Sequence, residues 1–247
     1  TMEFEKLMQP FQLKNLQLRN RVVMAPMLSR LCNPNGVVSQ KQIDYYAERA
    51  KGGVGLIIVE YSYIDELESK AHPVQLGVYD DQLIPGLGDL TEAIQERGAK
   101  VVLQICHAGR STSSRFMGRQ PIAPSAVPGP TGEMAREMSV AEIEAVIQAF
   151  AEAARRAKLA GFDGVELHST HGYLMAQFLS PYTNRRTDAY GRDRALFALK
   201  TLEAVRSKVG SDYLVGCRMT AFEFIEGGLT VDEAQAFARR MEEAGID

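Results

Sequence analysis

Cysteine is scarce in this sequence, and no two cysteines are close together. The three cysteines, Cys32, Cys106 and Cys217, lack the C-x-x-C spacing of zinc and iron–sulfur sites. Scattered single thiols are typical of proteins from a reducing compartment, so we expect a cytoplasmic protein. They give no indication of a metal centre, and we predict none.

Long apolar runs and an excess of one charge are also missing. No uninterrupted apolar run approaches the roughly 20 residues that span a bilayer, and the charged segment at residues 2–6 is unlike a signal peptide. The formal net charge is only -3, with lysine and arginine scattered along the chain. We therefore expect neither nucleic acid nor a membrane as a partner.

Short apolar runs alternate with segments of helical periodicity, which is the pattern of parallel βα units. Each run is apolar nearly throughout, as expected of a strand that is covered on both faces. No low-complexity linker divides the chain, so we expect a single domain over residues 1–247. The candidate strands are residues 21–27, 55–62, 100–108, 161–169 and 213–220.

The connecting helices have recognisable starts. Ser39, Ser139 and Thr230 are each followed three residues later by Gln or Glu, the spacing of a capping box. We expect the helix after Ser139 to pack on the sheet and to end at Gly161. Its apolar face consists of Ile143, Val146, Ile147, Phe150 and Ala154.

Residues 109–138 interrupt this compact pattern with a long segment rich in Gly, Pro, Ser and Thr. A loop of this length inside a domain is usually functional, often a lid or a substrate-binding excursion. A hairpin-bearing insertion that shields the edge of a barrel explains it equally well. The sequence leaves both alternatives open.

Repeated βα units form either an open doubly wound sheet or a closed eight-stranded barrel. No G-x-G-x-x-G follows the first strand, which disfavours the nucleotide-binding open sheet. A barrel builds its active site from the carboxyl ends of its strands, where this sequence places Met27, Glu60, Gln104, His107, His168, His171 and Arg218. We predict an α/β fold, the (β/α)8 TIM barrel, truncated to about its first five βα units.

His168, His171 and Tyr173 form the most informative group among these residues. Two neutral imidazoles can donate hydrogen bonds to an oxygen that gains negative charge, and a phenol can deliver a proton to carbon. Spacing alone is equally compatible with hydrogen-bonded core residues. An H-x-x-H pair can also bind metal, but no third ligand is evident nearby.

Two further polar residues lie on apolar strands. Arg218 needs an anion or a group rich in acceptors beside it, and an ion pair with a neighbouring carboxylate such as Glu166 would also satisfy it. Gln104 could pair with the amide edge of a ring, or it could be a satisfied core amide.

The stretch HSTHGYLMAQFLSP at residues 168–181, followed by TNRRTDAYG at 183–191, resembles the signature of the old yellow enzyme family of FMN-dependent ene-reductases. Other blocks agree in order: NRVVMAPM at 20–27, QICHAGR at 104–110 and IAPSAV at 122–127. The similarity runs over essentially the whole chain.

This resemblance implies a flavin site. Pro26 and Met27 would line FMN, Gln104 would hydrogen-bond its pyrimidine edge, and Arg218 would lie near N1 and O2. Two positions beside the flavin depart from the family. Leu28 replaces a Thr or Cys that tunes the flavin through O4, and Tyr61 replaces a small residue, so its ring must turn away from the flavin or the pocket differs.

The resemblance also implies a reaction. His168 and His171 would hold the carbonyl oxygen of an α,β-unsaturated substrate, and Tyr173 would protonate Cα while hydride passes from the flavin to Cβ. NADH or NADPH would supply the electrons. An alternative is the FMN barrel of a larger enzyme of the 2,4-dienoyl-CoA reductase type, which adds an iron–sulfur cluster and FAD. A non-flavin barrel enzyme and a non-catalytic module rank below both.

The resemblance predicts weak FMN binding by residues 1–247 alone. The family holds the FMN phosphate after its last two strands, and we find only about five strands before Asp247. We also expect the complete protein to form a homo-oligomer. A stoichiometric flavin spectrum from purified residues 1–247 would contradict the prediction of weak binding.

Overall fold

The structure, a computed structural model, describes residues 4–247. At its centre lies a parallel sheet with the strand order β3-β4-β5-β8-β9. Because each new strand is added on the same side, the order never reverses as it does in a doubly wound sheet. The predicted α/β fold is confirmed as a five-stranded half of a TIM barrel. Its strands are β3 (Val23–Met24), β4 (Leu56–Tyr63), β5 (Lys100–Cys106), β8 (Gly164–Ser169) and β9 (Leu214–Met219).

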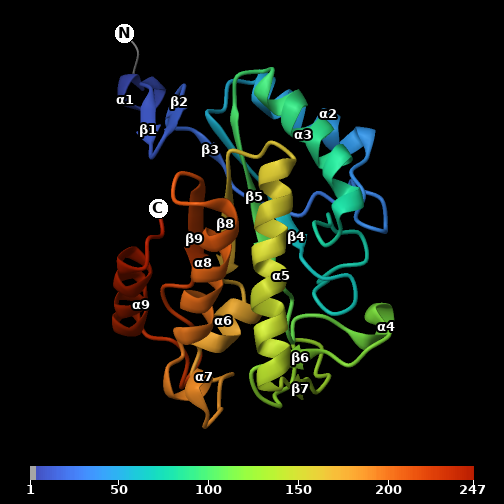
Figure 1. Ribbon diagram of the computed structural model, residues 1–247, viewed down its shortest axis with the longest axis vertical. Coiled ribbons are helices and arrows are strands. Elements are labelled where there is room, and N and C mark those ends of the chain that lie inside the picture. Colours follow the sequence, from blue (N-terminus) through green and yellow to red (C-terminus); the bar gives the residue numbers. More distant parts are fainter. Residues whose placement is uncertain (1–3) are drawn as a thin grey trace.

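Helices cover the outer face of this sheet, and α5 lies between α3 and α8 (Figure 1). Strand residues that face outward, such as Val59, Leu103 and Val165, share the main core with the helices. Phe178 and Phe197 stack within this core, with ring centroids 4.2 Å apart. The covering helices are α2 (Gln40–Lys51), α3 (Ile84–Gln95), α5 (Val140–Leu159), α8 (Leu196–Val209) and α9 (Val231–Glu243), with the 3-10 turn η1 (Asp81–Leu83) before α3.

A hairpin closes the amino end of the inner face. It consists of β1 (Phe11–Leu13) and β2 (Leu16–Leu18), which pair antiparallel and follow the short helix α1 (Glu5–Met8). Leu16 and Leu18 pack against inward residues of the sheet, including Ile58 and Val102. The inner face is therefore apolar at the amino end and free for polar residues at the carboxyl end.

The predicted helix starts are confirmed with one difference. Ser139 and Thr230 form complete capping boxes with Glu142 and Glu233. Ser39 accepts a hydrogen bond from the backbone of Gln42, but the Gln42 side chain is buried and the reciprocal bond is missing from the cap. As expected, α5 buries its apolar face, and Gly161 follows its end with φ +85°.

The predicted strand at residues 21–27 is shorter in the structure. Only Val23 and Met24 pair with β4, while the other four central strands begin and end within three residues of their predicted limits. β3 is the edge strand of the sheet and Pro26 has no N–H to donate, so the ladder ends before it. None of the helices within residues 4–247 combines the length and the apolar character that a membrane crossing needs.

Residues 109–138 fold into a compact excursion at the carboxyl end of the sheet (Figure 1). It contains α4 (Ser114–Met117) and the parallel pair β6 (Ile122–Ala123) and β7 (Arg136–Glu137). Ala123, Val127 and Ala135 form its own small core. Because β6 and β7 pair parallel, they are not a hairpin, and the antiparallel pairing in the segment is the isolated bridge between Pro128 and Met134. The segment lies beside the strand ends where a barrel places its site, and both alternatives for its role stay open.

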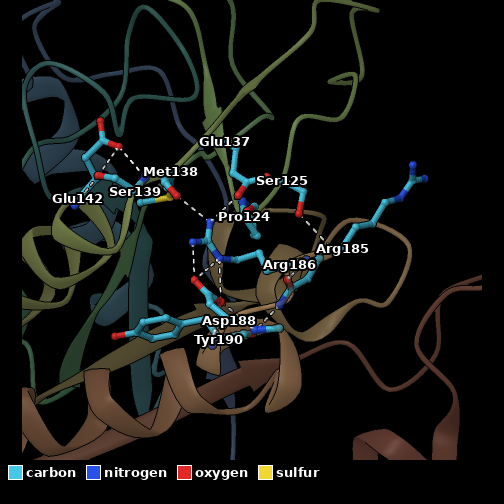
Figure 2. Close-up of polar contacts among 12 residues, drawn as sticks. Pro124, Ser125, Glu137, Met138, Ser139, Glu142, Arg185, Arg186, Asp188 and Tyr190 are labelled. Carbon is cyan, nitrogen blue, oxygen red and sulfur yellow. Dashed lines mark hydrogen bonds and ion pairs between the residues drawn. The ribbon is translucent and has the colours of Figure 1, made fainter.

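Arg186 connects this excursion to the loop between α6 (Leu174–Leu179) and α7 (Ala189–Arg192) (Figure 2). Its Nη1 donates to the carbonyl oxygens of Pro124 at 2.8 Å and Met138 at 2.6 Å. The guanidinium also pairs with Asp188, which caps α7, and this pairing lowers the pKa of Asp188. Because the Arg186 side chain is only 6% exposed, these contacts are shielded from solvent.

We predict that Arg186→Met loosens the excursion. Losing the partly exposed ion pair with Asp188 and the two hydrogen bonds to backbone carbonyls should lower the free energy of unfolding by about 2 kcal/mol. Proteolytic cleavage within residues 109–138 should become faster. Arg185→Met is the matched control, because the Arg185 side chain is exposed and extends away from this network (Figure 2). Equal losses in both variants, measured by urea unfolding, would contradict the role of Arg186.

Candidate active site

Four polar residues share the inner face of the sheet at its carboxyl end. Glu166 and His168 are two residues apart on β8, so both side chains point inward. Gln104 on β5 is the register partner of Glu166, and Arg218 on β9 is the register partner of His168. The parallel register therefore brings polar side chains from β5, β8 and β9 together on one surface.

The Glu166 carboxylate joins two of the predicted site residues. It accepts a hydrogen bond from Nε2 of Gln104 at 2.6 Å and pairs with Arg218, whose Nε lies 2.9 Å from Oε1. The ion pair considered from the sequence is thus present. The Arg218 side chain remains 35% exposed, so its positive charge also faces the open part of this surface.

His168 is buried and has a defined hydrogen-bonding role. The backbone N–H of Thr170 donates to its Nδ1 at 3.4 Å, which leaves the ring proton of the neutral imidazole on Nε2. Burial, followed by the nearby His171 and Arg218, lowers its pKa from 6.5 to about 3. His168 is therefore a neutral hydrogen-bond donor at physiological pH.

His171 and Tyr173 adjoin His168 as predicted. The ring centroid of His168 lies 5.3 Å from that of His171 and 4.9 Å from that of Tyr173. His171 adopts φ 57° and Gly172 φ 70°, a left-handed pair that turns the chain between β8 and α6. Burial is the main cause of the raised pKa of Tyr173, so its phenol stays protonated.

Gln177, which the sequence did not single out, holds this turn. Its buried Nε2 donates to the carbonyl oxygens of Ala108 at 3.0 Å and Gly172 at 2.7 Å, and its Oε1 accepts from the backbone of Arg110. These bonds tie the end of β5 to the turn that carries His171. The signal available in the sequence was a single amide within the otherwise apolar segment LMAQFL.

Tyr61 lies within this cluster as well. Its ring centroid is 5.3 Å from that of Tyr173 and 5.8 Å from that of His168. The Tyr61 ring is thus directed towards His168 and Tyr173, and its relation to the flavin stays a prediction. Pro26, Met27 and Leu28 follow β3, the strand beside β4, and Met27 is 58% exposed.

Two strand-end residues expected at the site have other roles. Glu60 is buried on the helical side, where its carboxylate accepts from the Ser29 backbone and the Tyr46 hydroxyl. His107 is buried, its Nδ1 accepts from Gly109, and burial lowers its pKa to about 4. Both belong to the supporting structure. Within residues 4–247, no group of three His, Cys, Asp or Glu residues is arranged to hold a metal ion.

Comparison with known proteins identifies the family to which this cluster belongs. Residues 6–247 match the NADH:flavin oxidoreductase / NADH oxidase family. The chain belongs to this family. The predicted resemblance to the old yellow enzymes is thereby confirmed.

Relatives in this family include proteins much longer than the present chain. The NADH oxidase of Thermoanaerobacter brockii is 47% identical over 248 residues, which cover 98% of this chain and 38% of that protein. The structure of 2-naphthoyl-CoA reductase with 2-naphthoyl-CoA matches with a TM-score of 0.93 at 35% identity, over 98% of this chain and 39% of that one. The old yellow enzyme homologue from Zymomonas mobilis matches with a TM-score of 0.88 at 29% identity, over 98% and 71%. The chain spans about two-fifths of the first two relatives.

In this member of the NADH:flavin oxidoreductase family, the inner face fits one edge of a flavin. A carboxamide has two N–H donors and an acceptor, so Gln104 retains both capacities after bonding to Glu166. The Arg218 guanidinium adds positive charge on the neighbouring part of the face. The N–H donors of Gln104 and Arg218 suit the carbonyl groups of the pyrimidine ring of FMN, and the Gln104 carbonyl oxygen suits its N–H group.

The neutral state of His168 predicts a pH dependence of stability. An unfolded chain protonates this histidine near pH 6.5, whereas the folded chain does so only near pH 3. Stability from this group is therefore complete above pH 6.5 and declines as the pH falls towards 3. In His168→Asn, the decline should be shallower by about 1.4 kcal/mol per pH unit. Equal slopes for parent and variant in urea unfolding would contradict a neutral His168.

Proposed function

We propose that residues 1–247 form the FMN-binding and substrate-reducing part of an NAD(P)H-dependent oxidoreductase. Its reaction would be reduction of the C=C bond of an α,β-unsaturated carbonyl compound. The observation that carries this proposal is the grouping of His168, whose Nδ1 accepts from the Thr170 backbone, with His171 and Tyr173. The family membership supports both the flavin and the nicotinamide nucleotide.

FMN would lie against the inner face of the sheet. Gln104 and Arg218 would contact its pyrimidine edge, and the backbone of Pro26, Met27 and Leu28 would border it from β3. When bound, reduced FMN supplies hydride to the substrate after NADH or NADPH has reduced it. The protein supplies position and polarity.

His168 and His171 would bind the carbonyl oxygen. Reduction at Cβ transfers negative charge to that oxygen, and hydrogen bonds that strengthen with this charge lower the barrier. His168 is suited to the task because it remains neutral, with its donor nitrogen directed away from the backbone N–H of Thr170. A protonated imidazole at this depth would instead require a buried counter-ion.

Tyr173 would deliver the proton to Cα. Its hydroxyl belongs to a phenol kept protonated by burial, at the start of α6 and 4.9 Å from the His168 ring between centroids. The substrate that accepts hydride at Cβ then gains a proton from Tyr173, and solvent restores the phenol. The balance is a two-electron reduction of one double bond.

A second candidate function is the FMN barrel of a larger flavoenzyme of the 2,4-dienoyl-CoA reductase type. It is favoured because the chain covers only 38% of the NADH oxidase and 39% of 2-naphthoyl-CoA reductase. A coenzyme A thioester is itself an α,β-unsaturated carbonyl compound when its acyl chain has a double bond between Cα and Cβ. An encoded cysteine cluster downstream of the barrel would identify this form. Homo-oligomer formation remains a prediction.

Tyr173→Phe tests the proton donor. In the FMN-loaded protein, we expect substrate reduction to slow by about 100-fold or more, the usual contribution of a general acid. Flavin reduction by NADH or NADPH should change little, because no proton reaches carbon in that step. Rapid mixing that follows flavin absorbance measures both half-reactions. Tyr45→Phe, on the outer helix α2, is the matched control. Equal slowing of both half-reactions would reject Tyr173.

A further inference from the structure

Tyr61 reaches the site through an irregularity in β4. Val59 pairs with Leu103 and Ser62 pairs with Ile105, so two residues of β4 face one residue of β5. A bulge of this kind redirects side chains and is frequent beside active sites.

The consequence is visible on either side of the bulge. Ile58 contributes to the inner face, and regular alternation would place Glu60 there and Tyr61 outside. Instead, Glu60 bonds to the Tyr46 hydroxyl of α2, and the Tyr61 ring faces His168 and Tyr173. The extra residue therefore exchanges a carboxylate for a phenol at the inner face.

Three rings form a closed triangle at this point. The centroid distances are 5.3 Å for Tyr61 to Tyr173, 5.8 Å for Tyr61 to His168 and 4.9 Å for His168 to Tyr173. The Tyr61 backbone is fixed as well, since its carbonyl accepts from Nε2 of Gln75 at 3.1 Å. The Tyr61 side chain thus lies beside the proposed proton donor on a backbone that is fixed by a hydrogen bond.

We propose that Tyr61 is a positioning residue for Tyr173, its phenol orienting the Tyr173 hydroxyl and donating a hydrogen bond to the phenolate that forms when Tyr173 protonates the substrate. This inference rests on the proposed function. In the step, the Tyr173 O–H bond breaks as the Cα–H bond forms. The Tyr61 hydroxyl keeps its own proton, and solvent returns one proton to Tyr173.

The test compares Tyr61→Phe with Tyr63→Phe in the FMN-loaded protein. Tyr63 is the matched control, because it lies on the same strand but stacks on Tyr79 and donates to the Asn35 carbonyl. Hydrogen bonds to charged groups are the stronger ones, so Tyr61→Phe should slow substrate reduction by about 10-fold. Its substrate affinity and its rate of flavin reduction should equal those of the parent. Tyr63→Phe should match the parent in the rate of substrate reduction, in substrate affinity and in the rate of flavin reduction.

A double variant separates positioning from an independent effect. Since Tyr61 acts through Tyr173, Tyr61→Phe combined with Tyr173→Phe should be no slower than Tyr173→Phe alone. Multiplicative slowing, or a rate for Tyr61→Phe within about twofold of the parent, would overturn the inference. If Tyr173→Phe itself has no effect on substrate reduction, the proposed function fails first.

A second readout does not depend on turnover. In flavin-free protein labelled with 13C at tyrosine Cζ, the Tyr173 resonance is assigned by its loss in Tyr173→Phe. Tyr61→Phe should shift this resonance, and Tyr63→Phe should leave it in place. The same spectra report whether each variant is folded. An unshifted Tyr173 signal in folded Tyr61→Phe would also overturn the inference.

Discussion

The buried carboxylate of Glu166 is the interaction on which the carboxyl end of the sheet depends. It is bonded to Gln104 on one neighbouring strand and to Arg218 on the other. Without these partners, a carboxylate at this depth would cost several kcal/mol of desolvation. The amide and the guanidinium are in turn fixed in place by the carboxylate. One anion thus sets the orientation of both side chains proposed to contact the flavin.

A second layer of polar contacts extends from this face to the loops. His168 stands one layer above Glu166 on β8, and Gln177 bonds the turn after β8 to the end of β5. Arg186 then joins the following loop to the 109–138 excursion. Polar contacts therefore connect the stretch from His168 to Tyr173 with the excursion, although both consist largely of irregular backbone.

Local patterns predicted the regular elements well. Apolar runs identified the central strands because parallel strands are covered on both faces, and hydroxyl-to-glutamate spacing identified the starts of α5 and α9. The first strand was predicted too long, since edge position and Pro26 limit its pairing to two residues. The grouping of His168, His171 and Tyr173 was also predictable, because they are neighbours in sequence around a single turn.

By itself, the sequence determined the α/β class, the succession of parallel units and the chemical groups at the end of β8. It did so because periodicity and short spacings express local physical preferences. Tertiary structure decided which distant groups meet those residues. Glu166 pairs with Arg218 through the register of β8 and β9, and Tyr61 reaches Tyr173 only because a bulge reverses its facing. Register and bulges arise from pairing between strands, so a single strand's sequence does not specify them.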